Sequence, residues 1–287
     1  MKKVLFYFAL IASITAIAQN KSPTSKSVTA FYNFISLEDS GINKPHYTTF
    51  GINTGWTTYK DIMFPGTDIE GKVVTKNKFA TRKNVLKCRI TGGDAYNNLF
   101  FTNTLAKQLK SEQWNFTQAN AFTYSMDFYI DNNIDCKTPN LSELEGLEFI
   151  FQKAMPPYSF LWGLQWSKSN VWSYWDDTRI KKKVKGWVRI REINACLKQR
   201  DWNTIQITGY QNDYELFYEN LYLNNETFPL NIKIQKSTLP TNFVENYLQV
   251  GFQINGNTAI RQDHRNGTDP VNVYLDNVNL ITGKQAF

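Results

Sequence analysis

Hydrophobic and polar residues alternate in short runs along most of this chain. The segments Asn84–Thr91 and Thr123–Ile130 are clear examples. Side chains two positions apart lie on the same face of a strand, so the even-numbered residues from Tyr124 to Ile130 form one apolar face. Such runs, bounded by Gly, Asn and Asp, predict an all-β protein.

Other runs of the same kind predict the remaining strands. They are Leu147–Lys153, Phe160–Trp166, Val171–Asp176, Asn203–Gly209, Tyr214–Leu223, Leu248–Ile254 and Val271–Ile281. Few stretches have helical periodicity, and the best helix candidate is the short polar segment Thr104–Gln113. Without a break in composition or an internal repeat, Phe31–Phe287 is predicted to form a single two-sheet antiparallel β-sandwich domain.

Four of the eight tryptophans fall within Ser159–Asp177. Ser167–Asn170 is predicted to be a four-residue turn that joins the strands on either side into a hairpin. On the first arm, Trp162 and Trp166 share a face with other apolar side chains. We expect both in the core, because burying a large apolar side chain contributes roughly 1.5–3 kcal/mol.

The second arm of this hairpin has a mixed face formed by Trp172, Tyr174 and Asp176. Aromatic rings provide flat platforms for the C–H faces of sugars, and carboxylates accept hydrogen bonds from hydroxyls. Two interpretations stay open: ligand contact, or packing at the rim or edge of a sheet. The polar partners expected beside a ligand here are Glu148, Gln152 and Gln165.

Three stretches have a distinctive order of strand and turn residues. Asp201–Leu223 contains a strand opened by tryptophan, a polar turn and the run Tyr-Glu-Leu-Phe-Tyr-Glu-Asn. It resembles a hairpin of concanavalin A-like lectin/glucanase domains and laminin-G-type jelly rolls. Val271–Thr282 resembles the last strand of these folds, and Phe34–Ser40 with Asn53–Trp56 resembles the opening of jelly-roll carbohydrate-binding modules. The resemblance implies a jelly-roll, concanavalin A-like sandwich that recognises a polysaccharide.

The resemblance also implies one cofactor, a structural calcium ion. Jelly-roll carbohydrate-binding modules often hold it through an early acidic residue and an aspartate of the final strand. The matching positions here are Glu38 or Asp39 with Asp276. Calcium takes about six to eight oxygen ligands, which include carbonyls that a sequence does not show.

Glucanases of this type use two catalytic glutamates about 5–5.5 Å apart on one strand face, with an aspartate between them. The corresponding strand here is Glu145–Lys153, and the corresponding positions hold Glu148, Ile150 and Gln152. An amide is not an acid, so the chain departs from the hydrolase pattern at the proton donor. Non-catalytic, lectin-like binding is therefore the preferred interpretation.

A polysaccharide lyase or degenerate glycoside hydrolase on the same fold is the second interpretation. Lyases remove a uronate proton with Tyr or His, and Arg261–Asn266 contains Arg261 and His264. These two residues and Glu148 are the catalytic candidates, and the basic balance of the chain suits an acidic sugar. Otherwise Arg261–Asn266 is an exposed polar loop. A third interpretation is an exported adhesion or structural module with a protein partner.

The N-terminus predicts export. Met1–Lys3 is basic, Val4–Ile17 is apolar, and Ala16–Ala18 has a small-x-small cleavage pattern. These features predict a signal peptide over 1–18, followed by a flexible leader over 19–30, and a secreted protein in an extracellular or periplasmic location. No later run reaches the roughly 20 apolar residues of a membrane-spanning helix.

Charge and cysteine content narrow the partners and the chemistry further. Removing Lys2 and Lys3 from 32 basic residues leaves 30 against 25 acidic ones, a net charge of +5, which is mild and argues against nucleic acid. The basic run Lys181–Lys183 is interpreted as a solvated loop or a guard on an edge strand. Cys88, Cys136 and Cys196 are compatible with one disulfide and a free thiol, or with three thiols.

Overall fold

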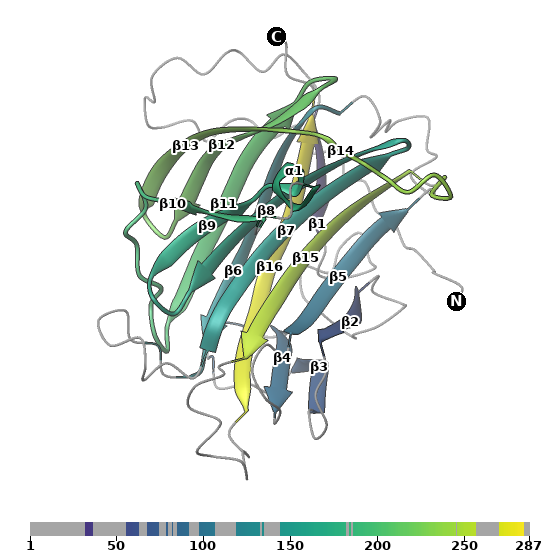
Figure 1. Cartoon of the computed structure of the whole chain (residues 1–287). Coiled ribbons are helices and arrows are strands. Elements are labelled where there is room, and N and C mark those ends of the chain that lie inside the picture. Colours follow the sequence, from purple (N-terminus) through teal and green to yellow (C-terminus); the bar gives the residue numbers. More distant parts are fainter. Residues whose placement is uncertain are drawn as a thin grey trace.

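The structure is a computed structural model of the chain. It describes residues 32–36, 56–62, 68–74, 79, 82, 85–91, 98–106, 119–132, 134, 144–181, 184, 186–244, 246–256 and 270–283. The predicted signal peptide and leader lie outside these residues. Within these residues, two antiparallel eight-stranded sheets form a β-sandwich, which confirms the predicted fold class (Figure 1).

The first sheet has β6 and β16 at its centre. In spatial order its strands are β13 (Glu226–Gln235), β12 (Glu215–Leu223), β11 (Trp202–Gln211), β6 (Ala121–Ile130), β16 (Val271–Gly283), β4 (Val85–Thr91) and β3 (Asp68–Val74). An eighth strand, β1 (Tyr32–Ser36), pairs with the end of β16.

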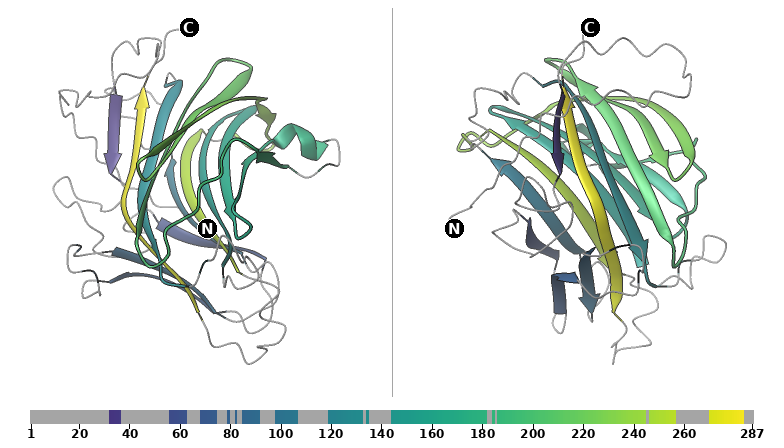
Figure 2. Two further views of the ribbon diagram at one scale, coloured as in Figure 1. Left: turned by 90° about the vertical axis from the view of Figure 1, so that its left-hand side faces the viewer. Right: turned by 180° about the vertical axis from the view of Figure 1, so that it is seen from behind.

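The second sheet lies against the first and carries the tryptophan-rich hairpin (Figure 2). In spatial order its strands are β10 (Trp187–Ile190), β9 (Val171–Trp175), β8 (Tyr158–Ser167), β7 (Leu144–Met155), β15 (Tyr247–Gly256), β5 (Asn98–Ala106) and β2 (Trp56–Ile62). The two-residue strand β14 (Ser237–Thr238) pairs with β8. One turn of helix, α1 (Asp177–Lys181), follows β9 and precedes β10 in the chain.

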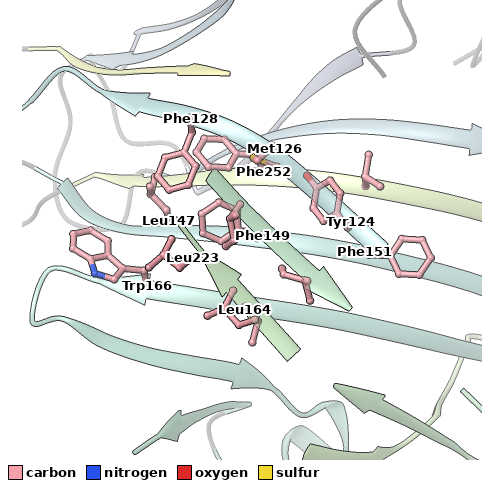
Figure 3. Packing of buried hydrophobic residues seen from close by; sticks show 14 of the residues in the cluster. Tyr124, Met126, Phe128, Leu147, Phe149, Phe151, Leu164, Trp166, Leu223 and Phe252 are labelled. Atoms are coloured by element: carbon pink, nitrogen blue, oxygen red, sulfur yellow. The ribbon is translucent and has the colours of Figure 1, made fainter. Parts of the chain in front are cut away.

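The core fills the space between the sheets, as the period-2 pattern predicts. The even-numbered side chains of β6 from Tyr124 to Ile130 are at most 1% exposed. Phe149 of β7 lies 5.3 Å from Phe128 of the opposite sheet and 5.6 Å from Phe252 of the neighbouring strand β15, measured between ring centroids (Figure 3). One continuous apolar cluster therefore joins both sheets.

A second, smaller aromatic cluster covers the outer face of the first sheet. Phe79 lies 4.5 Å from the ring of Tyr129 and 5.1 Å from the rings of Trp202 and Tyr274. These residues come from β6, β11, β16 and the segment between β3 and β4. Phe79 is thereby held against the outer face of this sheet by aromatic contacts.

The predicted strands all occur, with ends that shift by a few residues. The helix proposed for Thr104–Gln113 is wrong where the structure describes it, because Thr104–Ala106 belongs to β5 and pairs with β15. Residues 107–113 lie outside the described residues. Strand pairing there outweighs a weak local helical preference.

The cysteines favour the first of the two alternatives left open by the sequence. Cys196 is disulfide-bonded, and Cys88 is a free, fully buried thiol whose pKa is raised by burial. Cys136 lies outside the described residues.

Among the residues that the structure describes, no helix has the length and apolar character needed to cross a bilayer.

Candidate functional site

The loop between β8 and β9 decides which tryptophans face outward. The structure has a three-residue loop, Lys168–Asn170, instead of the predicted four-residue turn, and Asn170 takes a left-handed backbone conformation with φ 55°. Ser167 therefore pairs with Val171, and Trp166 pairs with Trp172. Residues directly opposite one another share a face, so one residue fewer in the loop reverses the predicted orientation of β9.

The predicted outward direction of the face formed by Trp172, Tyr174 and Asp176 is wrong for Trp172 and Tyr174, while ligand contact by Asp176 stays a prediction. Trp172 is 0% exposed in the core and donates a hydrogen bond from Nε1 to Ala195 O at 3.0 Å. Tyr174 packs against the same core. Asp176 accepts hydrogen bonds from N and Oγ1 of Thr178 and so begins α1. Trp162 and Trp166 of the first arm are buried, as predicted.

The outer face of the second sheet carries a line of polar side chains that crosses five neighbouring strands. Strand register places its members opposite one another. This line, the polar row, consists of Arg189, Ser173, Gln165, Glu148 and Gln253, from β10, β9, β8, β7 and β15. The order of these strands can be followed in Figure 1.

Hydrogen bonds fix the middle of the polar row. Oε1 of Glu148 accepts from Nε2 of Gln165 and from Nδ2 of Asn255, each at 2.9 Å. Gln253 in turn donates from Nε2 to Oδ1 of Asn255 at 2.8 Å. Glu148 and Gln253 are only 6% and 7% exposed. A buried carboxylate held by amides is rigid, because moving any partner away would leave a buried polar atom without a hydrogen bond, which costs free energy.

A pair of indoles borders the polar row on its β9–β10 side. Trp175 and Trp187 pair across these strands, with ring centroids 5.1 Å apart in an edge-to-face arrangement. They lie over Gly163, where an added Cβ would be 3.2 Å from Cβ of Trp175 and 3.5 Å from Cη2 of Trp187. The absence of a side chain at Gly163 allows this close approach. Trp175 also donates from Nε1 to Asp177 Oδ1.

Tyr218 supports this end of the face from inside the sandwich. Its hydroxyl accepts from Gly163 N at 2.8 Å and lies within donor distance of the carbonyl oxygens of Gly163 (3.2 Å) and Trp175 (3.3 Å). The β8–β9 pairing ends at Leu164 and Tyr174, so the phenol bonds backbone groups where the ladder has ended. Trp175, the last residue of β9, is therefore no longer paired with β8 and pairs only with Trp187 of β10.

The three predicted polar partners of a ligand share this outer face. Glu148 and Gln165 belong to the polar row. Gln152 also points outward and donates from Nε2 to Oγ of Ser159 at 2.8 Å. Ile150 lies between Glu148 and Gln152 on the same face, as the alternation predicted. Their contact with a ligand remains a prediction.

The other candidate residues divide into two groups. His264, Arg261, Glu38 and Asp39 lie outside the described residues. Asp276 lies on the outer face of the first sheet, where its Oδ2 is 2.5 Å from Nη1 of Arg82. Within the described part of the chain no group of three or more His, Cys, Asp or Glu side chains could hold a metal ion. Calcium stays a prediction, and the cation beside Asp276 is a guanidinium.

The sequence of β15 contains a signal for part of this site. In β15, Gln249, Gln253 and Asn255 alternate with the buried residues Leu248, Val250, Phe252 and Ile254. This period-2 pattern marks a polar face opposite a core face. Trp175 and Trp187 could not be assigned in the same way, because their direction depends on the loop length described above.

Comparison with known proteins gives similarity at the level of the fold. No family model matches this chain. No curated protein matches it either. Several solved structures are similar, including an alginate lyase from a Chlorella virus with 11% identity and a TM-score of 0.43, over 82% of this chain and 98% of that one.

Two other similar structures are of binding proteins. Lectin II from Ulex europaeus has 10% identity and a TM-score of 0.38 over 80% of this chain and 98% of that one. A protein described as a promiscuous carbohydrate-binding module of the β-sandwich superfamily has 12% identity and a TM-score of 0.37. The aligned part covers 79% of this chain but only 56% of that longer one. Identities this low do not distinguish a binding protein from an enzyme.

Proposed function

We propose that this protein binds a carbohydrate without catalysis on the outer face of its second sheet. The observation that supports this most directly is the polar row beside the Trp175–Trp187 pair. Sugars present hydroxyl groups around their edges and apolar C–H faces above and below the ring. A surface that binds them needs fixed hydrogen-bonding groups next to a flat apolar wall.

The polar row supplies donors and acceptors that are already positioned. Gln165 uses its amide N–H on Glu148, and its carbonyl oxygen is the acceptor that we expect a sugar hydroxyl to use. The hydroxyl of Ser173, opposite Gln165, both donates and accepts. Because Gln165, Glu148 and Gln253 are held by one another and by Asn255, a sugar binds without first ordering them, which lowers the entropic cost of association.

The same face argues against glycoside hydrolysis. A retaining or inverting glycosidase needs two carboxyl groups on opposite sides of the scissile bond. Glu148 is hydrogen-bonded to two amides. Its neighbours along the strand on this face are Ile150 and Gln152, neither of which ionises. Binding therefore fits these residues better than bond cleavage does.

The test is a titration of the purified protein with a panel of neutral and uronate-containing oligosaccharides, followed by tryptophan fluorescence and calorimetry. Trp187→Ala should raise Kd about tenfold, as expected when a central aromatic contact is lost. Tyr214→Ala is the control, because Tyr214 is 72% exposed and lies at the turn between β11 and β12 of the other sheet. No binding to any glycan, or equal Kd values for both variants, would contradict the proposal.

The same panel separates the two alternatives. A polysaccharide lyase would produce unsaturated uronates, whose ultraviolet absorbance increases during incubation. An adhesion or structural module would bind no free oligosaccharide but would bind a protein on the surface of the producing cell. Either result would replace the carbohydrate-binding proposal.

Export belongs to the same proposal. Protein recovered outside the cytoplasm should begin at Gln19, after removal of Met1–Ala18. N-terminal sequencing of that material provides the measurement. A mature chain that begins at Met1 would contradict it.

A further inference from the structure

One end of the sandwich interior holds a group of polar side chains, although apolar and aromatic side chains make up most of the described core. Lys153 of β7 points inward between the sheets and is 2% exposed. Its Nζ donates to the carbonyl oxygen of Ala119, just before β6 in the opposite sheet. A charged or strongly polar group at such depth needs several partners.

Two further polar side chains line a small cavity beside Lys153. They are Gln211 of β11 and Thr282 of β16, which are 7% and 2% exposed. Among the residues that the structure describes, neither Gln211 Oε1 nor Thr282 Oγ1 has a hydrogen-bond partner. Nearly all buried polar atoms in folded proteins are hydrogen-bonded, so two unpaired oxygens at one cavity indicate a site for a ligand that can bond to both.

The size of the cavity limits the ligand. The space available to the centre of a water-sized molecule is about 10 Å³, close to the minimum that one water needs. The remaining walls are largely apolar and include Phe122, Phe151 and Trp162. Nothing as large as a sugar or a carboxylic acid fits in that volume.

We propose that this cavity is a binding site for one ordered water molecule that links the two sheets. The water accepts a hydrogen bond from Nζ of Lys153 and donates to Oε1 of Gln211 and to Oγ1 of Thr282. Three protein partners are typical of a buried structural water. The site is separate from the outer face that carries the polar row, because Lys153, Gln211 and Thr282 all point into the interior.

The sign of the change in Tm caused by Thr282→Val distinguishes a hydroxyl that binds water from one that is unpaired. If the hydroxyl binds water, the variant loses a hydrogen bond and Tm falls by about 2–4 °C. If the hydroxyl is simply unpaired, valine replaces a buried polar atom with a methyl group, and Tm stays equal or rises. Thr123→Val is the control, because Thr123 lies on the outer face of neighbouring β6 and should leave Tm unchanged.

A double variant with Gln211→Met tests whether the two oxygens share one ligand. The combined loss in Tm should be smaller than the sum of the single losses, because one water is lost only once. Strictly additive losses would overturn the proposal. Thr282→Ser keeps the hydroxyl and should stay close to the wild-type Tm.

A crystal structure of the unmodified protein tests the site even if a variant does not fold. Electron density for a single water within about 3 Å of Lys153 Nζ, Gln211 Oε1 and Thr282 Oγ1 is expected. A direct bond from Lys153 to either oxygen, or a cavity without density, would overturn the proposal.

Discussion

Among single residues, Arg82 has the clearest role in stability. Its guanidinium pairs with Asp127 at 2.9 Å and with Asp276 at 2.5 Å, and it stacks 3.8 Å above the ring of Trp202. Asp127 also accepts from Thr204 and Asn277. The arginine thus neutralises two largely buried carboxylates on neighbouring strands β6 and β16.

Arg82→Met should destabilise the fold by about 3–5 kcal/mol, because both carboxylates remain without their cation. The free energy of unfolding in urea is the measurement. Restoring neutrality with Asp127→Asn and Asp276→Asn in the same chain should recover part of the loss. The control is Lys198→Ala, since its pair with Asp201 is exposed at 4.0 Å and should contribute little. Equal effects of the two single substitutions would contradict this role.

The charge of Lys153 predicts how stability changes with pH. Burial lowers its pKa from 10.5 to about 7 in the folded protein, while the unfolded chain keeps the higher value. Between these values the unfolded state binds a proton that the folded state does not, so stability rises from about pH 7 toward pH 10. The upper limit for a shift of this size is about 5 kcal/mol.

Above about pH 10 the buried phenols reverse this trend. Burial raises the pKa of Tyr124 and of Tyr218, so the unfolded chain loses their protons first and stability falls. Urea unfolding at a series of pH values measures both parts of the curve. Lys153→Met should flatten the rise between pH 7 and 10 and leave the fall above pH 10. Parallel curves for wild type and variant would contradict the assignment to Lys153.

At the scale of elements, the end of the β8–β9 ladder positions the Trp175–Trp187 pair. Tyr218→Phe removes the hydroxyl that bonds Gly163 and Trp175 while keeping the ring. The buried Gly163 N–H then lacks its partner, which costs about 1–3 kcal/mol. Because Trp175 is carried by the same strand end, glycan affinity should fall as well. Urea unfolding and the glycan titration measure the two effects.

Tyr222→Phe is the matched control for this prediction. Tyr222 belongs to the same strand, β12, but lies on its outer face and is half-buried. Its loss of a hydroxyl should change neither stability nor glycan affinity appreciably. A Tyr218→Phe protein as stable as the Tyr222→Phe protein would show that the phenol does not hold the strand end.

A second element-level prediction concerns the close packing over Gly163. Gly163→Val should displace Trp175 and Trp187, because the Cβ alone is tight against Trp175 at 3.2 Å and in contact with Trp187 at 3.5 Å, and the two γ carbons extend beyond it. Bulkier branching at this position shifts both rings and should weaken glycan binding more than it lowers Tm. Chemical shifts of the two indole N–H groups report the movement. Unchanged shifts and unchanged affinity would contradict the close packing.

At the scale of the whole molecule, one core joins the sheets. Phe128 of the first sheet and Phe149 and Phe252 of the second belong to a single buried cluster. If one sheet unfolded, the apolar inner face of the other would be exposed to water. We therefore expect the two sheets to unfold in one cooperative transition. Tryptophan fluorescence and far-ultraviolet circular dichroism should give coincident urea curves. Two separate midpoints would indicate independent units.

The sequence determined the class of fold and the inward faces of most central strands. Alternation alone indicated that Tyr124 to Ile130 line the core, that Trp162 and Trp166 are buried, and that Glu148 and Gln152 face outward. These inferences succeed because side chains alternate strictly along a strand, so one buried residue fixes its neighbours. The same reasoning applied to β15 indicates that Gln253 and Asn255 face outward.

Only the tertiary structure decided how separate strands combine into a site. The hydrogen bond from Asn255 to Glu148 joins residues 107 positions apart, and strand register brings them together. The face presented by β9 depended on a loop of three residues instead of four, a small difference in local backbone conformation that reverses a whole strand. Local pattern therefore fixed which side chains share a face, while loop length and long-range pairing fixed which faces meet.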